Sequence, residues 1–123
     1  MVLALLALAI AVPVPVPTQT GFLTPSGNIA CNAGPYHGKP LLACTVFSKA
    51  DPKRGQQVWA MGATGRVSVG FVFGNSATDY PKLAYGRSRT WHTIRCRSAL
   101  ASLTCTNRSG HGFFLSRKIQ RVF

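Results

Sequence analysis

Four cysteines constrain the fold of this chain more than any other feature, because their pairing would fix which short segments lie side by side. They are Cys31, Cys44, Cys96 and Cys105. Four cysteines allow three pairings. Each neighbouring pair lies on two short apolar or β-branched runs that are separated by Gly, Pro, Ser or Ala, so each pair can face across a β-hairpin. We therefore predict the disulfides Cys31–Cys44 and Cys96–Cys105, each worth about 2.5–3 kcal/mol by chain entropy.

The spacing of the cysteines argues against a structural zinc site. Such sites usually bring their ligands in Cys-x(2–4)-Cys pairs, whereas twelve and eight residues separate the members of the two pairs here. We expect no metal and no cofactor. Disulfides are typical of proteins outside the reducing cytosol, and pairing all four thiols leaves none to act as a nucleophile.

Strand patterns dominate the rest of the chain. Twelve glycines and eight prolines interrupt it every few positions, and helical apolar spacing is absent beyond the first residues. Short runs with turn residues between them predict strands. We expect them at residues 28–32 and 41–47, 93–98 and 103–106, and 112–116 and 119–123.

The clearest strand pattern covers residues 66–73. Val67, Val69, Phe71 and Phe73 fall on one face of this run, which predicts a central strand. By contrast, residues 49–64 are expected to form an irregular excursion.

These patterns predict an all-β fold, a small disulfide-stapled sandwich or barrel of short antiparallel strands. The length allows one domain, which we place at residues 21–123. Its core is expected to draw on residues 41–47, 67–73, 83–85, 94, 100–103 and 113–115.

An uncharged apolar segment opens the chain. Residues 1–12 are apolar throughout, and residues 13–17 alternate proline and valine, which forbids a continuing helix. The run is far shorter than the roughly 20 residues that span a bilayer, and it has the length of a signal-peptide apolar region. We predict a signal peptide and Pro/Val spacer over residues 1–20, a secreted or cell-envelope location, and no transmembrane span in the mature protein. A buried N-terminal segment is the alternative, and no basic residue precedes the run.

The charge of the chain points to an anionic partner. Fourteen Lys and Arg stand against two acidic residues, Asp51 and Asp79, giving a formal net charge of +12. Such a chain attracts anionic polymers or anionic membrane surfaces. Nucleic acid is another possible partner, although no recognised nucleic-acid-binding motif is present.

In the predicted hairpin of residues 93–98 and 103–106, the alternation of side chains places part of this charge on one face. Ile94 and Cys96 fall on one face, and Arg95 and Arg97 on the other. Eight of the 14 basic residues lie from residue 87 onward, and closing strands beside this hairpin would make one basic face. The candidate anion-binding residues are Arg95, Arg97, Arg108, Arg117 and Lys118.

Enzyme chemistry has few candidates here. Catalysis by a carboxylate pair would need Asp51 and Asp79, both expected in loops, to converge on one substrate. A nucleophilic serine of the hydrolase type has no Gly-x-Ser-x-Gly motif here. The remaining alternative is an RNA-cleaving hydrolase in which two histidines act as acid and base beside a cation. His111, His92 and His37 are its candidate residues. The simpler interpretation places all three in ordinary turns, and we expect a protein that is not an enzyme.

Two stretches and the segments between them carry a family resemblance. They are TPSGNIAC at residues 24–31 and TCTNRSGHGFFLSR at residues 104–117, with LAYG at residues 83–86 between them. The chain thereby resembles a family of small exported bacterial proteins, of actinomycete type, that carry a domain of unknown function. The resemblance implies export and a disulfide-stapled fold built on the four cysteines. It implies no activity, and no catalytic residue follows from it.

Three functions remain open from the sequence. The preferred one is a non-enzymatic exported domain that binds an anionic partner through its arginine-rich C-terminal half. The second is the secreted basic hydrolase. The third is a structural protein of the cell envelope whose charge only sets where it accumulates.

Overall fold

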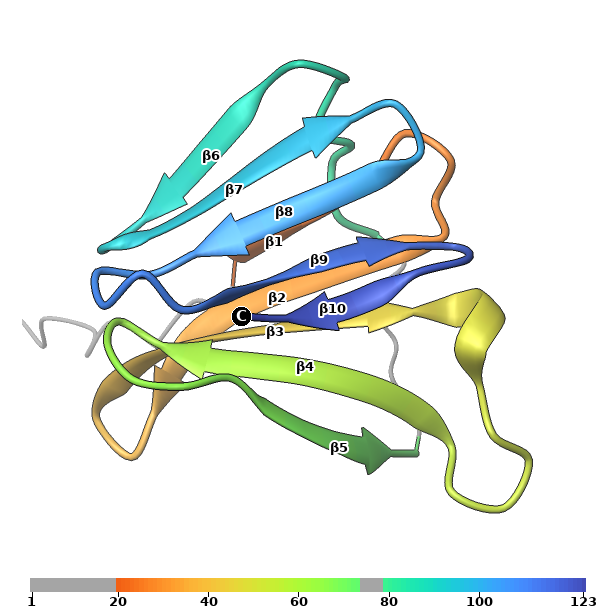
Figure 1. Ribbon diagram of the computed structural model, residues 1–123, viewed down its shortest axis with the longest axis horizontal. Coiled ribbons are helices and arrows are strands. Elements are labelled where there is room, and N and C mark those ends of the chain that lie inside the picture. Colours follow the sequence, from red (N-terminus) through yellow and green to blue (C-terminus); the bar gives the residue numbers. More distant parts are fainter. Residues whose placement is uncertain (1–19, 74–78) are drawn as a thin grey trace, which may run out of the picture.

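The computed structural model describes residues 20–73 and 79–123, and in them the chain forms ten β-strands (Figure 1). The predicted signal peptide and spacer lie outside these residues except for Thr20. The first sheet contains β1 (Thr20–Leu23), β2 (Ile29–Tyr36), β3 (Lys39–Val46), β4 (Gln56–Gly62) and β5 (Ser68–Val72). The second contains β6 (Ser88–Trp91), β7 (Ile94–Ala99), β8 (Ser102–Thr106), β9 (Gly112–Ser116) and β10 (Gln120–Val122). One short 3₁₀ turn, η1 (Phe47–Lys49), follows β3.

Each sheet is an antiparallel meander in which every strand pairs with its neighbour in sequence. The orders are β1-β2-β3-β4-β5 and β10-β9-β8-β7-β6. One cluster of buried side chains, drawn from both sheets, fills the space between them. The prediction of an all-β, disulfide-stapled fold is therefore confirmed, in its sandwich form. In the described ranges, no helix is long and apolar enough to cross a membrane.

The core follows from strand alternation. Phe22, Cys31, Cys44 and Trp59 are neighbours across β1 to β4 and are all buried. In β7 the pattern is strictly buried then exposed, with Ile94, Cys96 and Ser98 inward. Side chains on successive positions point to opposite faces, so one face of each sheet supplies the core.

Both predicted disulfides are present. Cys31–Cys44 joins β2 to β3 and Cys96–Cys105 joins β7 to β8, and in each case the bonded residues are direct cross-strand partners with Cα atoms 4.1 Å apart. The sulfur atoms of Cys31, Cys44 and Cys105 lie within 4.8 Å of one another. The two bridges therefore face each other across the buried interior.

Two predictions about the first sheet were wrong. Residues 66–73 contain β5, which pairs with β4 and lies at the edge of the first sheet, not at its centre. Val69 there is 47% exposed and Phe73 is 72% exposed. Residues 49–64 are not irregular throughout, because they contain β4, whose Trp59 and Met61 are buried.

Part of the expected core is also on the surface. Leu100 is 81% exposed and Tyr85 is 49% exposed, because Leu100 sits in the tight turn between β7 and β8 and Tyr85 in the connection before β6. Strands β1 and β6 were not expected, and they meet at one edge of the sandwich. There the guanidinium of Arg89 donates to the Thr20 hydroxyl at 2.8 Å and to the Gly21 carbonyl at 3.2 Å.

Candidate functional site

The outward side of the second sheet carries the basic residues that the hairpin pattern predicted. Arg95 and Arg97 alternate with buried residues of β7 and are exposed. The register places further outward residues beside them in rows across the sheet. We call this surface the arginine face: Ser88, Thr90, Arg95, Arg97, Thr104, Thr106, Phe114 and Arg121.

The cations of the arginine face are spread out and do not converge on a point. Arg95 and Arg97 stand two residues apart on one strand, about 7 Å. Arg97 and Arg121 belong to one row, separated by β8 and β9, which is about 14 Å. This spacing suits a polymer with repeated anionic groups better than a single anionic group.

Hydroxyl and aromatic groups hold and flank these guanidinium groups. Arg95 donates from Nη2 to the Ser88 hydroxyl at 3.3 Å. Arg121 lies over the ring of Phe114, 5.2 Å from its centroid, a cation–π contact. Arginine held in this way still presents free N–H donors to a ligand.

In the part of the chain that the structure describes, no carboxylate forms an ion pair with a cation of this face. Asp51 lies before β4 and forms an ion pair of 2.9 Å with Arg54. The backbone N–H of Lys53, followed by the Arg54 guanidinium, holds the pKa of the Asp51 carboxyl below its ordinary value. Asp79, the only other acidic residue, belongs to the connection between β5 and β6. The cations of the arginine face are therefore not neutralised by side-chain carboxylates.

The other predicted anion-binding residues lie in turns. Arg108 is in the β8–β9 turn, where its N–H donates to the Ala63 carbonyl. Arg117 and Lys118 occupy the β9–β10 turn at the opposite end of the sandwich. The structure thus gathers two of the five predicted residues, Arg95 and Arg97, on one face. Arg121 joins them, and sequence reasoning had not singled it out.

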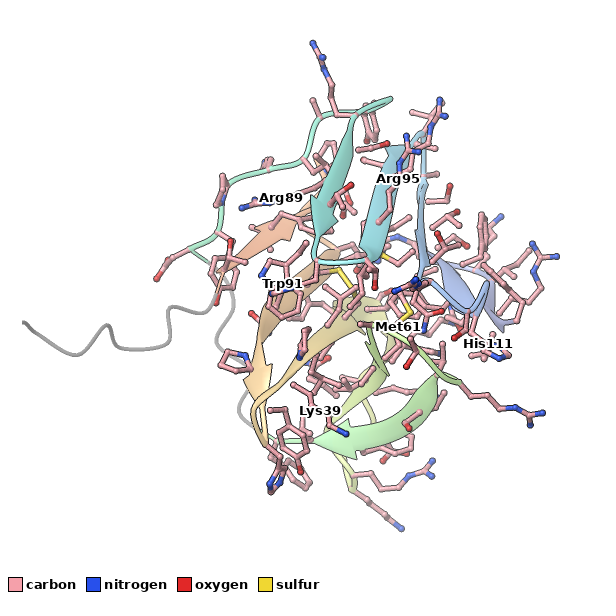
Figure 2. All side chains as sticks on the ribbon, turned by 90° about the vertical axis from the view of Figure 1, so that its left-hand side faces the viewer. Lys39, Met61, Arg89, Trp91, Arg95 and His111 are labelled. Carbon is pink, nitrogen blue, oxygen red and sulfur yellow. A yellow bond between two sulfur atoms is a disulfide. The ribbon has the colours of Figure 1, made fainter. Side chains whose placement is uncertain are left out.

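The three candidate histidines occupy three different turns. His37 follows β2 in the first sheet, whereas His92 and His111 follow β6 and β8 in the second. The ring of His37 lies edge-on to Tyr36 and that of His92 edge-on to Trp91. Figure 2 shows Trp91 and His111 on different flanks of the molecule. The three imidazoles thus belong to separate turns, and in residues 20–73 and 79–123 no hydrogen bond links one of them to another.

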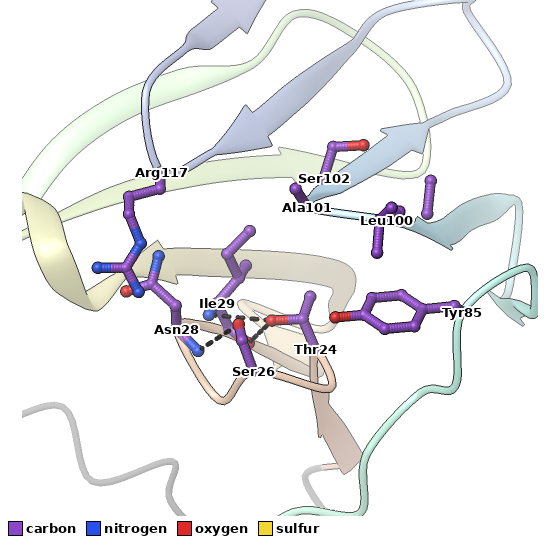
Figure 3. Close-up of a pocket in the computed structure, with 10 residues that line it drawn as sticks. Thr24, Ser26, Asn28, Ile29, Tyr85, Leu100, Ala101, Ser102 and Arg117 are labelled. Carbon is purple, nitrogen blue, oxygen red and sulfur yellow. Dashed lines mark hydrogen bonds between the residues drawn. The ribbon is translucent and has the colours of Figure 1, made fainter.

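A small pocket opens at the end of the sandwich that holds Arg117 (Figure 3). Its volume is about 190 Å³. The β1–β2 turn, the β7–β8 turn, Tyr85 and Arg117 surround it. Its polar lining residues are Thr24, Ser26, Asn28, Tyr85, Ser102 and Arg117. Sequence reasoning did not identify this pocket, because its walls come from four separate parts of the chain.

Fold and surface together define a small all-β sandwich that is stapled by two buried disulfides and carries a basic outer face. Residues 52–123, more than half of the chain, match a family of unknown function (DUF6636), and the chain belongs to this family. The matched range begins before β4 and covers the whole second sheet, including the stretch at residues 104–117. No curated protein and no solved structure matches the chain.

Proposed function

We propose that this protein is an exported, non-enzymatic domain that binds an anionic polymer through the arginine face. The observation that carries the proposal is the exposure of three arginines on a sheet that bears no acidic side chain. Export is supported by the apolar segment at residues 1–12 and by two disulfides in a small domain.

The chemistry of the face favours binding without turnover. Arginine forks donate two parallel hydrogen bonds to a carboxylate or a phosphate, and neighbouring Thr and Ser hydroxyls add further donors. Each exposed contact contributes little alone, but the contributions of several cations add together along a polymer. Hydrolysis would need an acid and a base within reach of one bond, and no such pair lies on this face.

A binding panel tests the proposal. The purified, oxidised protein is titrated with polygalacturonate, poly-uridylate and anionic lipid vesicles at 50 and 200 mM salt, and the integrity of each substrate is followed. We expect affinity for at least one polyanion, weaker at the higher salt because counterion release drives it, and no breakdown.

The other outcomes separate the alternatives. Breakdown of poly-uridylate that disappears in His111→Ala would support the hydrolase instead. No binding at 50 mM salt would leave only the structural envelope protein.

A further inference from the structure

We propose that the pocket beside Arg117 is a second binding site, which takes one oxyanion group on a small, partly apolar body such as an acidic sugar unit. The site is separate from the arginine face and does not depend on polymer binding there. It lies at the end of the sandwich formed by the β1–β2, β7–β8 and β9–β10 turns.

The pocket offers hydrogen-bond donors and no negative side chain. Arg117 reaches from the β9–β10 turn toward Asn28 in Figure 3. In the described part of the chain, its guanidinium makes no hydrogen bond or ion pair. A planar guanidinium with free N–H groups binds carboxylate or phosphate in a bidentate manner. Neither Asp51 nor Asp79 lines the pocket.

The β1–β2 turn fixes the second donor. The Asn28 side-chain oxygen accepts from the N–H of Ser48 at 3.1 Å, which leaves its amide NH₂ available to the pocket. The Ser26 hydroxyl accepts from the Asn28 backbone N–H at 3.2 Å and keeps its own hydrogen to donate. The Thr24 hydroxyl is already bonded to the backbone of Ile29, so it shapes the wall and does not bind.

Tyr85 and Leu100 give the rim an apolar part. Tyr85 directs its hydroxyl into the pocket in Figure 3, while half of its surface is exposed. Leu100 is held outward by the β7–β8 turn, in which Ala101 adopts a left-handed φ of 64°.

The size of the pocket sets the size of the ligand. Pockets that hold drug-sized ligands have roughly 300–1,000 Å³, so about 190 Å³ accommodates one small unit. Paired donors select an oxyanion, and the Tyr85–Leu100 rim covers the C–H face of a sugar ring. A carboxylated sugar and a phosphate share this oxyanion chemistry.

Calorimetric titration with glucuronate, inorganic phosphate and glucose tests the site. We expect glucuronate or phosphate to bind, and glucose not to bind. Arg117→Ala should lower at least tenfold the affinity for the oxyanion that binds. The matched control is Lys118→Ala, which removes the same charge from the same turn but not from the pocket, and should change affinity less than twofold.

Two further measurements test whether the ligand binds in this pocket. Amide shifts in NMR spectra should move at Ser26, Asn28 and Leu100, and Tyr85→Phe should weaken binding while leaving the fold intact. The stronger of the two oxyanions identifies the source of the group.

Arg95→Ser/Arg97→Ser should leave glucuronate or phosphate binding unchanged, which separates this site from polymer binding. Absence of binding by both oxyanions, or equal losses in Arg117→Ala and Lys118→Ala, would overturn the proposal.

Discussion

Asn107 joins the two sheets through its side-chain amide, and it is only 7% exposed. Its Nδ2 donates to the carbonyl of Gly62, the last residue of β4, at 3.2 Å, and to that of Gly65, in the turn between β4 and β5, at 2.8 Å. Its Oδ1 accepts from the N–H groups of Ser109 and His111 in its own turn. The Asn107-Arg108-Ser109 triplet fits the N-glycosylation pattern, but the amide nitrogen is used inside the fold.

Replacing Asn107 should therefore destabilise the protein. Asn107→Ala removes four hydrogen bonds and leaves partly buried backbone groups unpaired, which costs about 2–3 kcal/mol. Asn107→Asp should also destabilise, because a carboxylate would face two carbonyl oxygens. Urea denaturation measures both changes. A loss in the free energy of unfolding below about 0.5 kcal/mol in both variants, less than one typical hydrogen bond contributes, would show that the hydrogen bonds of Asn107 are dispensable.

Asp51 should make stability depend on acidic pH. Because the pKa of its carboxyl is lowered in the folded state, the ionised form stabilises the fold above the ordinary value of 3.8. That contribution is lost as the pH falls through the lowered pKa. We expect the melting temperature of the wild type to fall more than that of Asp51→Asn between pH 5 and pH 2. Identical acid dependence in the two proteins would contradict this assignment.

At the scale of the elements, the two disulfides hold one hairpin in each sheet. They close short segments, with sequence separations of 13 and 9, and their four sulfurs are buried. Removing the second bridge in Cys96→Ala/Cys105→Ala should lower the free energy of unfolding by about 2–4 kcal/mol, through chain entropy and lost packing. The same measurement on Cys31→Ala/Cys44→Ala provides the comparison. Unchanged stability in both would show that the fold does not rely on its staples.

Hairpins were predictable because they depend on neighbouring residues. The runs at 93–98 and 103–106 alternate cleanly, and each carries one cysteine of a local pair, so pairing and register followed together. The position of a strand within its sheet depends on distant contacts. Residues 66–73 showed which side chains share a face, but not that β5 would lie at an edge.

Strand β4 was missed although its sequence alternates. Trp59 and Met61 point into the core between half-buried Val58 and Ala60. The polar residues that precede it, including the turn in which Asp51 pairs with Arg54, hid this short pattern. Strands β1 and β6 are only four residues each, too short for periodicity to identify.

The same difference between local and distant contacts explains which parts of the two candidate sites could be predicted from the sequence. The arginine face follows from alternation within one hairpin, so Arg95 and Arg97 could be predicted. Phe114 and Arg121 join them through the pairing of β8, β9 and β10. The sequence suggested that closing strands could extend this face, but it did not show which of their residues would lie on it. The pocket beside Arg117 combines turns that are far apart in sequence, and only the folded sandwich brings them together.

At the scale of the whole molecule, the central question is whether polyanion binding depends on the total net charge or on where the cations lie on the surface. A net charge of +12 attracts any polyanion without specificity. The arginine face predicts more, because its three arginines share one surface with hydroxyls and an aromatic ring. In Figure 2 Arg95 lies in the upper part of the view and Lys39 in the lower part, so cations outside this face provide a control for total charge.

The most direct test compares two double variants of equal charge. Arg95→Ser/Arg97→Ser and Lys39→Ser/Lys53→Ser each lower the net charge from +12 to +10, since 12 − 2 = 10. Their affinity for the polyanion that the wild type binds best is measured as a function of salt. We predict that the arginine variant loses at least tenfold in affinity and that its log–log salt slope falls by about 1.4–1.8, while the lysine variant changes less than threefold. Equal losses in the two variants would contradict the account, because binding would then follow total charge and not the arginine face.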